Sequence, residues 1–172
     1  MDTKTFFEID FHASLYPLKT NYLVIQNHHK ALEKYISKIL SDDPAHIGHN
    51  FLPQTRVHAA KPHNHLRRTV VLDPVASYFV YDLIFRNRQA FGTSVSPSRR
   101  SFGYRFEIDQ PLPVHKAYKD FNYEVKLNKQ HVYQHMVSFD IASYFNSIYH
   151  HDATNWFASL PNVSGNDANA FG

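Results

Sequence analysis

Hydrophobic residues recur every three or four positions in four segments of the chain, which is the spacing of one buried face of an α-helix. The first of these predicted helices ends by Asp43-Pro44. Its apolar face consists of Leu32, Tyr35, Ile36, Ile39 and Leu40, and charged residues lie between them.

The second predicted helix has the clearest start. Asp73 is a typical N-cap residue, and Pro74 suits the first helical position because its missing N–H would have no partner there. We expect this helix to run to Gly92 as a C-cap. Its buried stripe is Val75, Phe79 and Leu83, whereas Asp82, Arg86 and Arg88 face water or a partner.

The remaining two predicted helices lie in the C-terminal half. Residues 116–129 predict an irregular helix with Tyr118, Phe121 and Val125 facing inward. Residues 143–160 show a helical stripe that includes Ile148 and Trp156, and the polar segment 162–169 is expected to be a loop.

Other segments alternate between apolar and polar residues, or contain many β-branched and aromatic residues, and predict strands. Residues 1–27 alternate in short pieces separated by Pro17, so we expect short strands or an extended arm. Residues 67–72 and 133–139 predict two further strands, and residues 46–61, which contain Gly48 and Pro53, predict a loop.

These elements give an α+β fold in one domain-sized chain of 172 residues. We divide it into an N-terminal extension at residues 1–55, a central part at 56–130 and a C-terminal part at 131–172. The central part is basic, with 13 Lys and Arg against 6 Asp and Glu, while the flanking parts are slightly acidic.

All eight arginines lie between Arg56 and Arg105. A guanidinium matches phosphate better than an ammonium does, so this concentration indicates a polyanionic partner. The alternative is that the basic residues only cover a solvated face.

Composition excludes several kinds of site. The chain has no cysteine, hence no disulfide, thiolate nucleophile or cysteine zinc site. Its 13 histidines include His46, His49, His63, His65 and the pair at 150–151, but none has metalloprotease spacing, and surface or structural roles are favoured. No apolar run is long enough for a membrane span, so we expect a cytoplasmic protein.

The stretch with the sequence FDIASYFNSI at residues 139–148 presents one carboxylate, Asp140, where a predicted strand gives way to a turn and a helix. An unpaired carboxylate in an apolar strand is costly unless a cation accompanies it. With the following His150 and His151, this stretch resembles motif A of reverse transcriptases.

The resemblance implies a right-hand polymerase, with fingers at residues 56–130 and the first part of the palm at 131–172. Such an enzyme adds deoxynucleotides to a 3′ end with two Mg²⁺ ions, or Mn²⁺ in their place. Asp140 and the backbone carbonyl of Ile141 would be metal ligands. Phe145 would exclude a 2′-hydroxyl, although its spacing alone fits a core aromatic.

The same resemblance assigns residues to the triphosphate of the nucleotide. Backbone N–H groups of Ser143 and Tyr144 would hold it. Arg68 would neutralise it, with Arg67 or Arg105 as second candidates, although Arg67 and Arg68 could also be solvated residues at a strand edge.

Two further features of the family are absent from the sequence, namely a Tyr-x-Asp-Asp hairpin and the Gln-Gly that precedes it. We therefore expect the chain to be the N-terminal part of a longer reverse transcriptase and to be inactive alone. The alternative is a non-catalytic, polymerase-derived subunit that binds nucleic acid or acts as a scaffold.

Three stretches, namely residues 67–82, 102–106 and 139–151, make the chain most similar to the bacterial defence-associated reverse transcriptases, specifically the b-type subunit of the type 3 two-polymerase system. That likeness implies antiviral defence and binding of an RNA or other template, a DNA product and deoxynucleotide triphosphates. It also implies a companion reverse transcriptase, a non-coding RNA and an oligomeric assembly.

Overall fold

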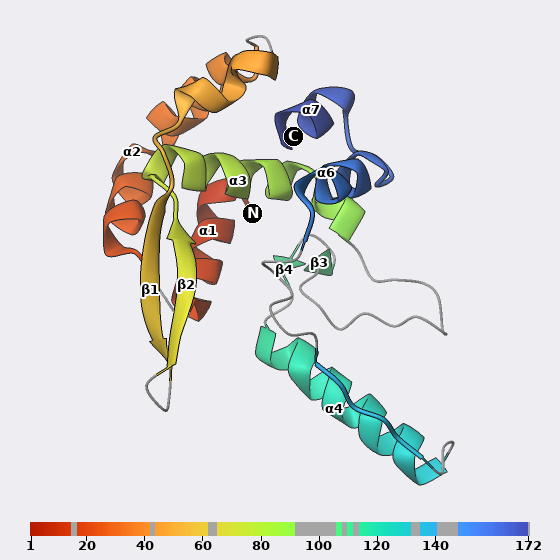
Figure 1. The fold of residues 1–172 in the computed structure, drawn as a ribbon. Coiled ribbons are helices and arrows are strands. Elements are labelled where there is room, and N and C mark those ends of the chain that lie inside the picture. Colours follow the sequence, from red (N-terminus) through yellow and green to blue (C-terminus); the bar gives the residue numbers. More distant parts are fainter. Residues whose placement is uncertain are drawn as a thin grey trace. The chain divides into compact units, whose positions relative to one another are not determined.

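A computed structural model describes residues 1–14, 17–41, 44–61, 65–91, 106–107, 110–111, 114–131, 135–140 and 148–171. Helices and two small antiparallel sheets make up this part of the chain, so the expected α+β class is confirmed (Figure 1). The chain divides into two compact units, Met1–Arg86 and Asn87–Gly172. In the part described, none of the helices combines the length and the apolar character needed to cross a membrane.

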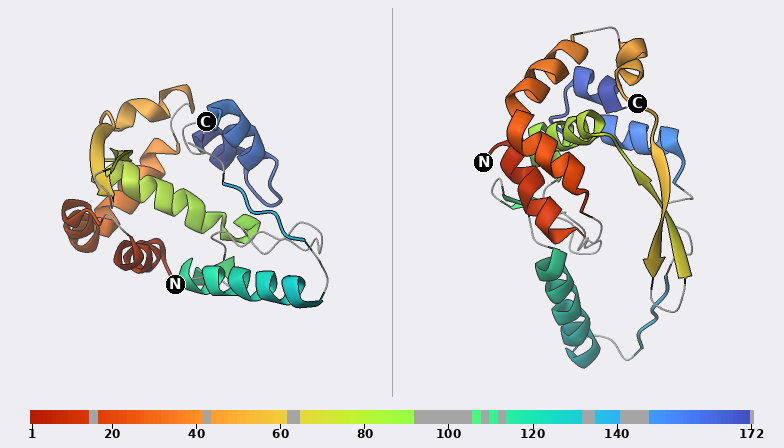
Figure 2. Two further views of the ribbon diagram at one scale, coloured as in Figure 1. Left: turned by 60° about the horizontal axis from the view of Figure 1, so that its bottom comes forward. Right: turned by 90° about the vertical axis from the view of Figure 1, so that its left-hand side faces the viewer.

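Three helices form the core of the first unit: α1 (Thr3–Ala13), α2 (Lys19–Ile39) and α3 (Pro74–Arg86). They pack pairwise, and α3 contacts both of the others (Figure 2). Their buried hydrophobic side chains are Phe6, Phe7, Ile25, Leu32, Ile36, Ile39, Ala76, Tyr78, Phe79, Leu83 and Phe85.

The prediction of short strands over residues 1–27 is wrong, because this segment forms α1 and the first part of α2. Asp2 caps α1 by accepting a 2.8 Å hydrogen bond from Thr5 N. Phe6 and Phe7 are then buried against Tyr81 and Phe85 of α3. The predicted helix ending near Asp43-Pro44 is confirmed as the C-terminal part of α2, which has one non-helical residue, His28.

The predicted loop over residues 46–61 is also largely wrong. It contains most of a 3₁₀ helix, η1 (Pro44–Asn50), and all of strand β1 (Thr55–Lys61). β1 pairs antiparallel with β2 (His65–Val71), which confirms the strand expected over residues 67–72. The two strands form a ribbon. Its extensive contacts within the described residues are those between the two strands themselves (Figure 1).

The predicted start of α3 is confirmed. Asp73 Oδ1 accepts hydrogen bonds from Val75 N at 2.8 Å and Ala76 N at 3.1 Å. α3 ends at Arg86, and a separate 3₁₀ helix, η3 (Arg88–Phe91), follows, so the expected continuous helix is shorter than predicted. Asp82 is half-buried rather than facing water, because it accepts a 3.0 Å hydrogen bond from Thr3 and pairs with Arg86 at 2.8 Å.

The second unit contains the two-residue strands β3 (Phe106–Glu107) and β4 (Gln110–Pro111), which pair with each other, and the helix α4 (Val114–His131). α4 confirms the helix predicted over residues 116–129, but Tyr118 is 65% and Phe121 42% exposed, so the inward positions predicted for these two rings are wrong. α6 (His150–Ala158) and α7 (Gly165–Phe171) pack together, with the rings of Phe157 and Phe171 stacked at 4.5 Å.

Two predictions about this C-terminal region are corrected. The expected helix over residues 143–160 is described only as the shorter α6, since residues 141–147 lie outside the described part. The expected loop over 162–169 instead contains most of α7. Buried Asp167 accepts a 3.0 Å hydrogen bond from buried Asn87, a contact between residues 80 positions apart that sequence patterns do not reveal.

Candidate nucleic-acid interface

The β1–β2 ribbon has one fully exposed face. In the strand register, His58 lies opposite Arg68, Arg56 opposite Val70, and Ala60 opposite Leu66. Paired residues of an antiparallel ribbon point to the same side, and side chains alternate along each strand. These six residues therefore share a face, and all six are exposed.

This face combines cations with apolar surface. Arg56, His58 and Arg68 supply two guanidinium groups and an imidazole, and none of the six residues is acidic. Within the described residues, no carboxylate pairs with either arginine. Leu66 is 69% and Val70 48% exposed, which leaves apolar surface beside the charges.

The base of the ribbon is fixed to the helices by two hydrogen bonds. Asp73 Oδ2 accepts one of 3.2 Å from Leu52 N, shortly before β1. The buried side chain of Asn21 on α2 donates another, of 3.1 Å, to Leu72 O, directly after β2. The carboxylate of Asp73 therefore caps α3 and also binds the segment that leads into β1. It links the start of the ribbon to the start of α3.

Two of the residues predicted to contact a nucleotide lie on this ribbon. Arg68 is on the exposed face just described, and Arg67 is in β2 opposite Ala59. Arg105, Ile141, Ser143, Tyr144 and Phe145 lie outside the described residues. The structure therefore tests none of the roles assigned to those five.

Asp140 ends a described segment, residues 135–140, in which no strand is formed and every side chain is exposed. The expected strand over residues 133–139 is thus absent from the described residues 135–139. Phe139 is 83% and Val137 86% exposed, so neither apolar side chain is buried against a described element. Asp140 and Arg68 belong to different units.

The described residues contain no group of three or more His, Asp or Glu that could hold a metal ion. His46 and His49, two of the histidines considered for zinc, have ring centroids 5.7 Å apart and are both exposed. Asp140 supplies one carboxylate, which alone does not fit a two-metal centre.

A small cavity lies between the helices of the first unit. Its volume is about 90 Å³, and its lining includes Phe7, Phe11 and Tyr81. Pockets for small-molecule ligands measure about 300–1,000 Å³. The exposed ribbon face is therefore the better candidate for ligand contact in the first unit.

Sequence reasoning identified Arg68 but missed Arg56 and His58, because residues 46–61 were expected to be a loop. A weak signal was present. Polar Arg56 and His58 lie on either side of apolar Val57, which is the alternation of a strand. Pro62 and Asn64 then separate this segment from the next strand, as in a hairpin.

Comparison of the chain with protein-family models, with curated proteins and with solved structures gave no significant match.

Proposed function

We propose that this chain is the N-terminal portion of a reverse transcriptase that acts in bacterial antiviral defence. The observation that carries the proposal is the FDIASYFNSI stretch, whose carboxylate, Asp140, is exposed. The exposed basic face of the β1–β2 ribbon supports it independently, because a polymerase must hold both a template and a charged nucleotide.

On this proposal the ribbon belongs to the fingers. Arg68 contacts the triphosphate of the incoming nucleotide, and Arg56 and His58 contact phosphates of the nucleic acid. Leu66 and Val70 offer apolar surface to a base or sugar. The anchoring of the ribbon by Asp73 gives these groups a fixed base, which reduces the entropy lost on binding.

Asp140 would be one ligand of the Mg²⁺ or Mn²⁺ that such a polymerase uses, together with the carbonyl of Ile141. The described residues contain no group of acids that could complete such a metal site. Backbone N–H groups of Ser143 and Tyr144, with Arg67 or Arg105, would assist in binding the triphosphate. A companion reverse transcriptase, a non-coding RNA and an oligomeric assembly remain part of the proposal through the family resemblance.

The test is primer extension with Mg²⁺ and deoxynucleotides, using the polypeptide encoded by the whole reading frame and residues 1–172 alone. We expect the first to extend a primer and Asp140→Asn to abolish extension, because it removes an anionic metal ligand at nearly constant shape. Circular dichroism shows whether the variant folds. Primer extension that survives Asp140→Asn overturns the proposal.

The role of Phe145 has its own test in the same assay. Phe145→Ala should relax the exclusion of ribonucleotides, because it opens space for a 2′-hydroxyl, while Phe145→Tyr should keep the exclusion. If Phe145→Ala retains full discrimination and only lowers stability, Phe145 is a core residue.

A second candidate is a non-catalytic nucleic-acid-binding subunit, favoured by the basic ribbon without an acidic cluster in the described residues. It predicts salt-sensitive binding to nucleic acid and no synthesis from the whole polypeptide. Association that does not change with salt would instead indicate a protein partner.

A further inference from the structure

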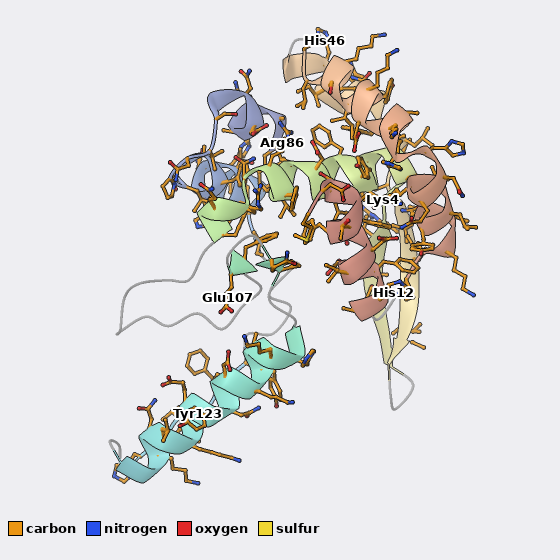
Figure 3. The ribbon with its side chains drawn as sticks, turned by 180° about the vertical axis from the view of Figure 1, so that it is seen from behind. Lys4, His12, His46, Arg86, Glu107 and Tyr123 are labelled. Carbon is orange, nitrogen blue, oxygen red and sulfur yellow. The ribbon has the colours of Figure 1, made fainter. Side chains whose placement is uncertain are left out.

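Helix α4 carries a stripe of exposed residues that the proposed function does not use. Lys116, Lys119, Tyr123 and Lys126 follow one another at intervals of three, four and three residues, which places them on one side of the helix. All four are exposed, and Tyr123 is 64% exposed (labelled in Figure 3).

The stripe faces away from the buried side of α4. Ala117, which is 3% exposed, marks that buried side, and it lies more than a quarter turn from Tyr123. The two acids of the helix, Asp120 and Glu124, are half-buried and lie beside the stripe rather than within it.

The lysines of the stripe differ in whether a described carboxylate balances their charge. Lys116 lies 3.5 Å from Glu107, so part of its charge is already balanced. Among the described residues, no carboxylate pairs with Lys119 or Lys126. Tyr123 lies between these two lysines in the sequence, four residues after the first and three before the second.

We infer that this stripe binds single-stranded nucleic acid, with Tyr123 stacking on a base and Lys119 and Lys126 contacting phosphates. An aromatic platform flanked by cations is how proteins hold single strands without reading their sequence. The seven positions from Lys119 to Lys126 span about 10 Å along the helix. The inference requires no polymerase activity and stands apart from the roles of Asp140 and Arg68.

The chemistry of the stripe fits this partner better than a membrane or an acidic protein. A membrane-binding helix sets its cations beside a broad apolar face. The other exposed rings of α4, Tyr118 and Phe121, lie more than a quarter turn from Tyr123, and the stripe itself has one aromatic residue with a polar tip. An acidic protein would pair with the lysines but would not require an exposed ring between them. Of a single strand, a membrane and an acidic protein, only the single strand has bases that would stack on the exposed ring of Tyr123.

The test measures binding of residues 1–172 to fluorescent 20-mers by anisotropy, over a range of salt concentrations. The probes are oligo(dT), oligo(U) and a 20-base-pair DNA duplex. We expect Tyr123→Ala to weaken binding to both single strands about tenfold and to leave duplex binding nearly unchanged, because paired bases are not available for stacking. Tyr123→Phe keeps the ring and should retain affinity.

The double variant Lys119→Gln with Lys126→Gln should lower the slope of log affinity against log salt by about 1.4, since each lost contact with a single strand contributes about 0.7. The matched control is Lys34→Gln with Lys38→Gln on α2, where two exposed lysines lie near a 40% exposed Tyr35. The control removes equal charge and should change the slope far less. Circular dichroism confirms that each variant keeps its helices.

Two results overturn the inference. One is an equal loss of affinity in the α4 and α2 double variants, which would mean that only net charge matters. The other is single-strand binding that Tyr123→Ala leaves unchanged. If an acidic peptide then displaces the oligonucleotide, the stripe is a protein-binding surface. A preference for oligo(U) over oligo(dT), or the reverse, identifies the natural strand as RNA or DNA.

Discussion

The side-chain amide of Asn21 in α2 donates a 3.1 Å hydrogen bond to the carbonyl oxygen of Leu72, at the junction between β2 and α3. Asn21 is 6% exposed, so this polar group is held inside the first unit only because it has a partner. The bond fixes the end of the ribbon to the helical core across 51 residues of sequence.

We predict that Asn21→Leu destabilises the first unit by about 1–3 kcal/mol, because it leaves the part-buried carbonyl of Leu72 without its donor. Hydrogen exchange of the slowest amides in α2 and α3 measures the loss. Asn27→Ala is the control, since Asn27 makes an exposed 2.8 Å bond to Leu23 O in the same helix and should cost less than about 0.5 kcal/mol. If Asn21→Leu and Asn27→Ala lowered the stability equally, the buried Asn21 amide would contribute no more than an exposed one.

Asp73 provides a second test of the same junction. Asp73→Ala removes the acceptor for Val75 N and Ala76 N and should cost about 1 kcal/mol, the usual value of an N-cap. Asp73→Asn keeps an acceptor oxygen and should lose much less. Hydrogen exchange within α3 compares the two variants, and an equal loss would mean that the negative charge, rather than the hydrogen bonds, stabilises the helix start.

Local signals explain which elements the sequence predicts. Asp73-Pro74 identifies the start of α3, and the spacing of apolar residues identifies α4, because both signals lie within a few residues. The first helix is missed since the short apolar and polar pieces around Phe6, Ile9 and Phe11 are interpreted as strands. Its true pattern depends on α3, where Tyr81 and Phe85 cover the aromatic rings of α1.

The candidate site shows the same limit. Arg68 is found from its own strand, but its neighbours Arg56 and His58 follow only from the pairing register of β1 with β2. β1 has just two β-branched residues, Thr55 and Val57, so its sequence alone favours a strand weakly. Pairing with β2 supplies the stabilisation that its composition does not.

Tyr78 provides a prediction for alkaline pH. Its ring is fully buried, and its hydroxyl donates a 3.0 Å hydrogen bond to Glu33. Burial, and then this bond to a carboxylate, raise the pKa of Tyr78 well above its ordinary value of 10. The folded state therefore disfavours the phenolate, and the stability linked to Tyr78 is complete below pH 10 and is lost as the pH rises towards the raised pKa.

Absorbance titration of the tyrosines near 295 nm measures this effect, with Tyr78→Phe as the comparison. The difference between the two proteins isolates Tyr78 among the 11 tyrosines. We expect its ionisation to begin only above pH 10 and to accompany loss of helix content. A difference curve with a midpoint at the ordinary pKa would show that the ring is accessible to solvent in the folded protein.

The ribbon face can be tested in the absence of a nucleotide, when Arg68 should contact a backbone phosphate of the bound strand beside Arg56 and His58. Arg68→Gln should weaken binding of oligo(dT) about tenfold, the effect of one charge-assisted contact of about 1.5 kcal/mol, and should lower the salt slope by about 0.7. Arg68→Lys should keep the slope but lose part of the affinity, because an ammonium cannot make the two parallel hydrogen bonds of a guanidinium. Lys30→Gln is the control. It removes one exposed charge from α2 and should change both the affinity and the salt slope little.

Because Arg68 shares its exposed face with Arg56 and His58, the double variant Arg56→Gln with Arg68→Gln should lose more affinity than either single variant. If the double variant binds as tightly as the native chain at every salt concentration, the ribbon does not contact nucleic acid.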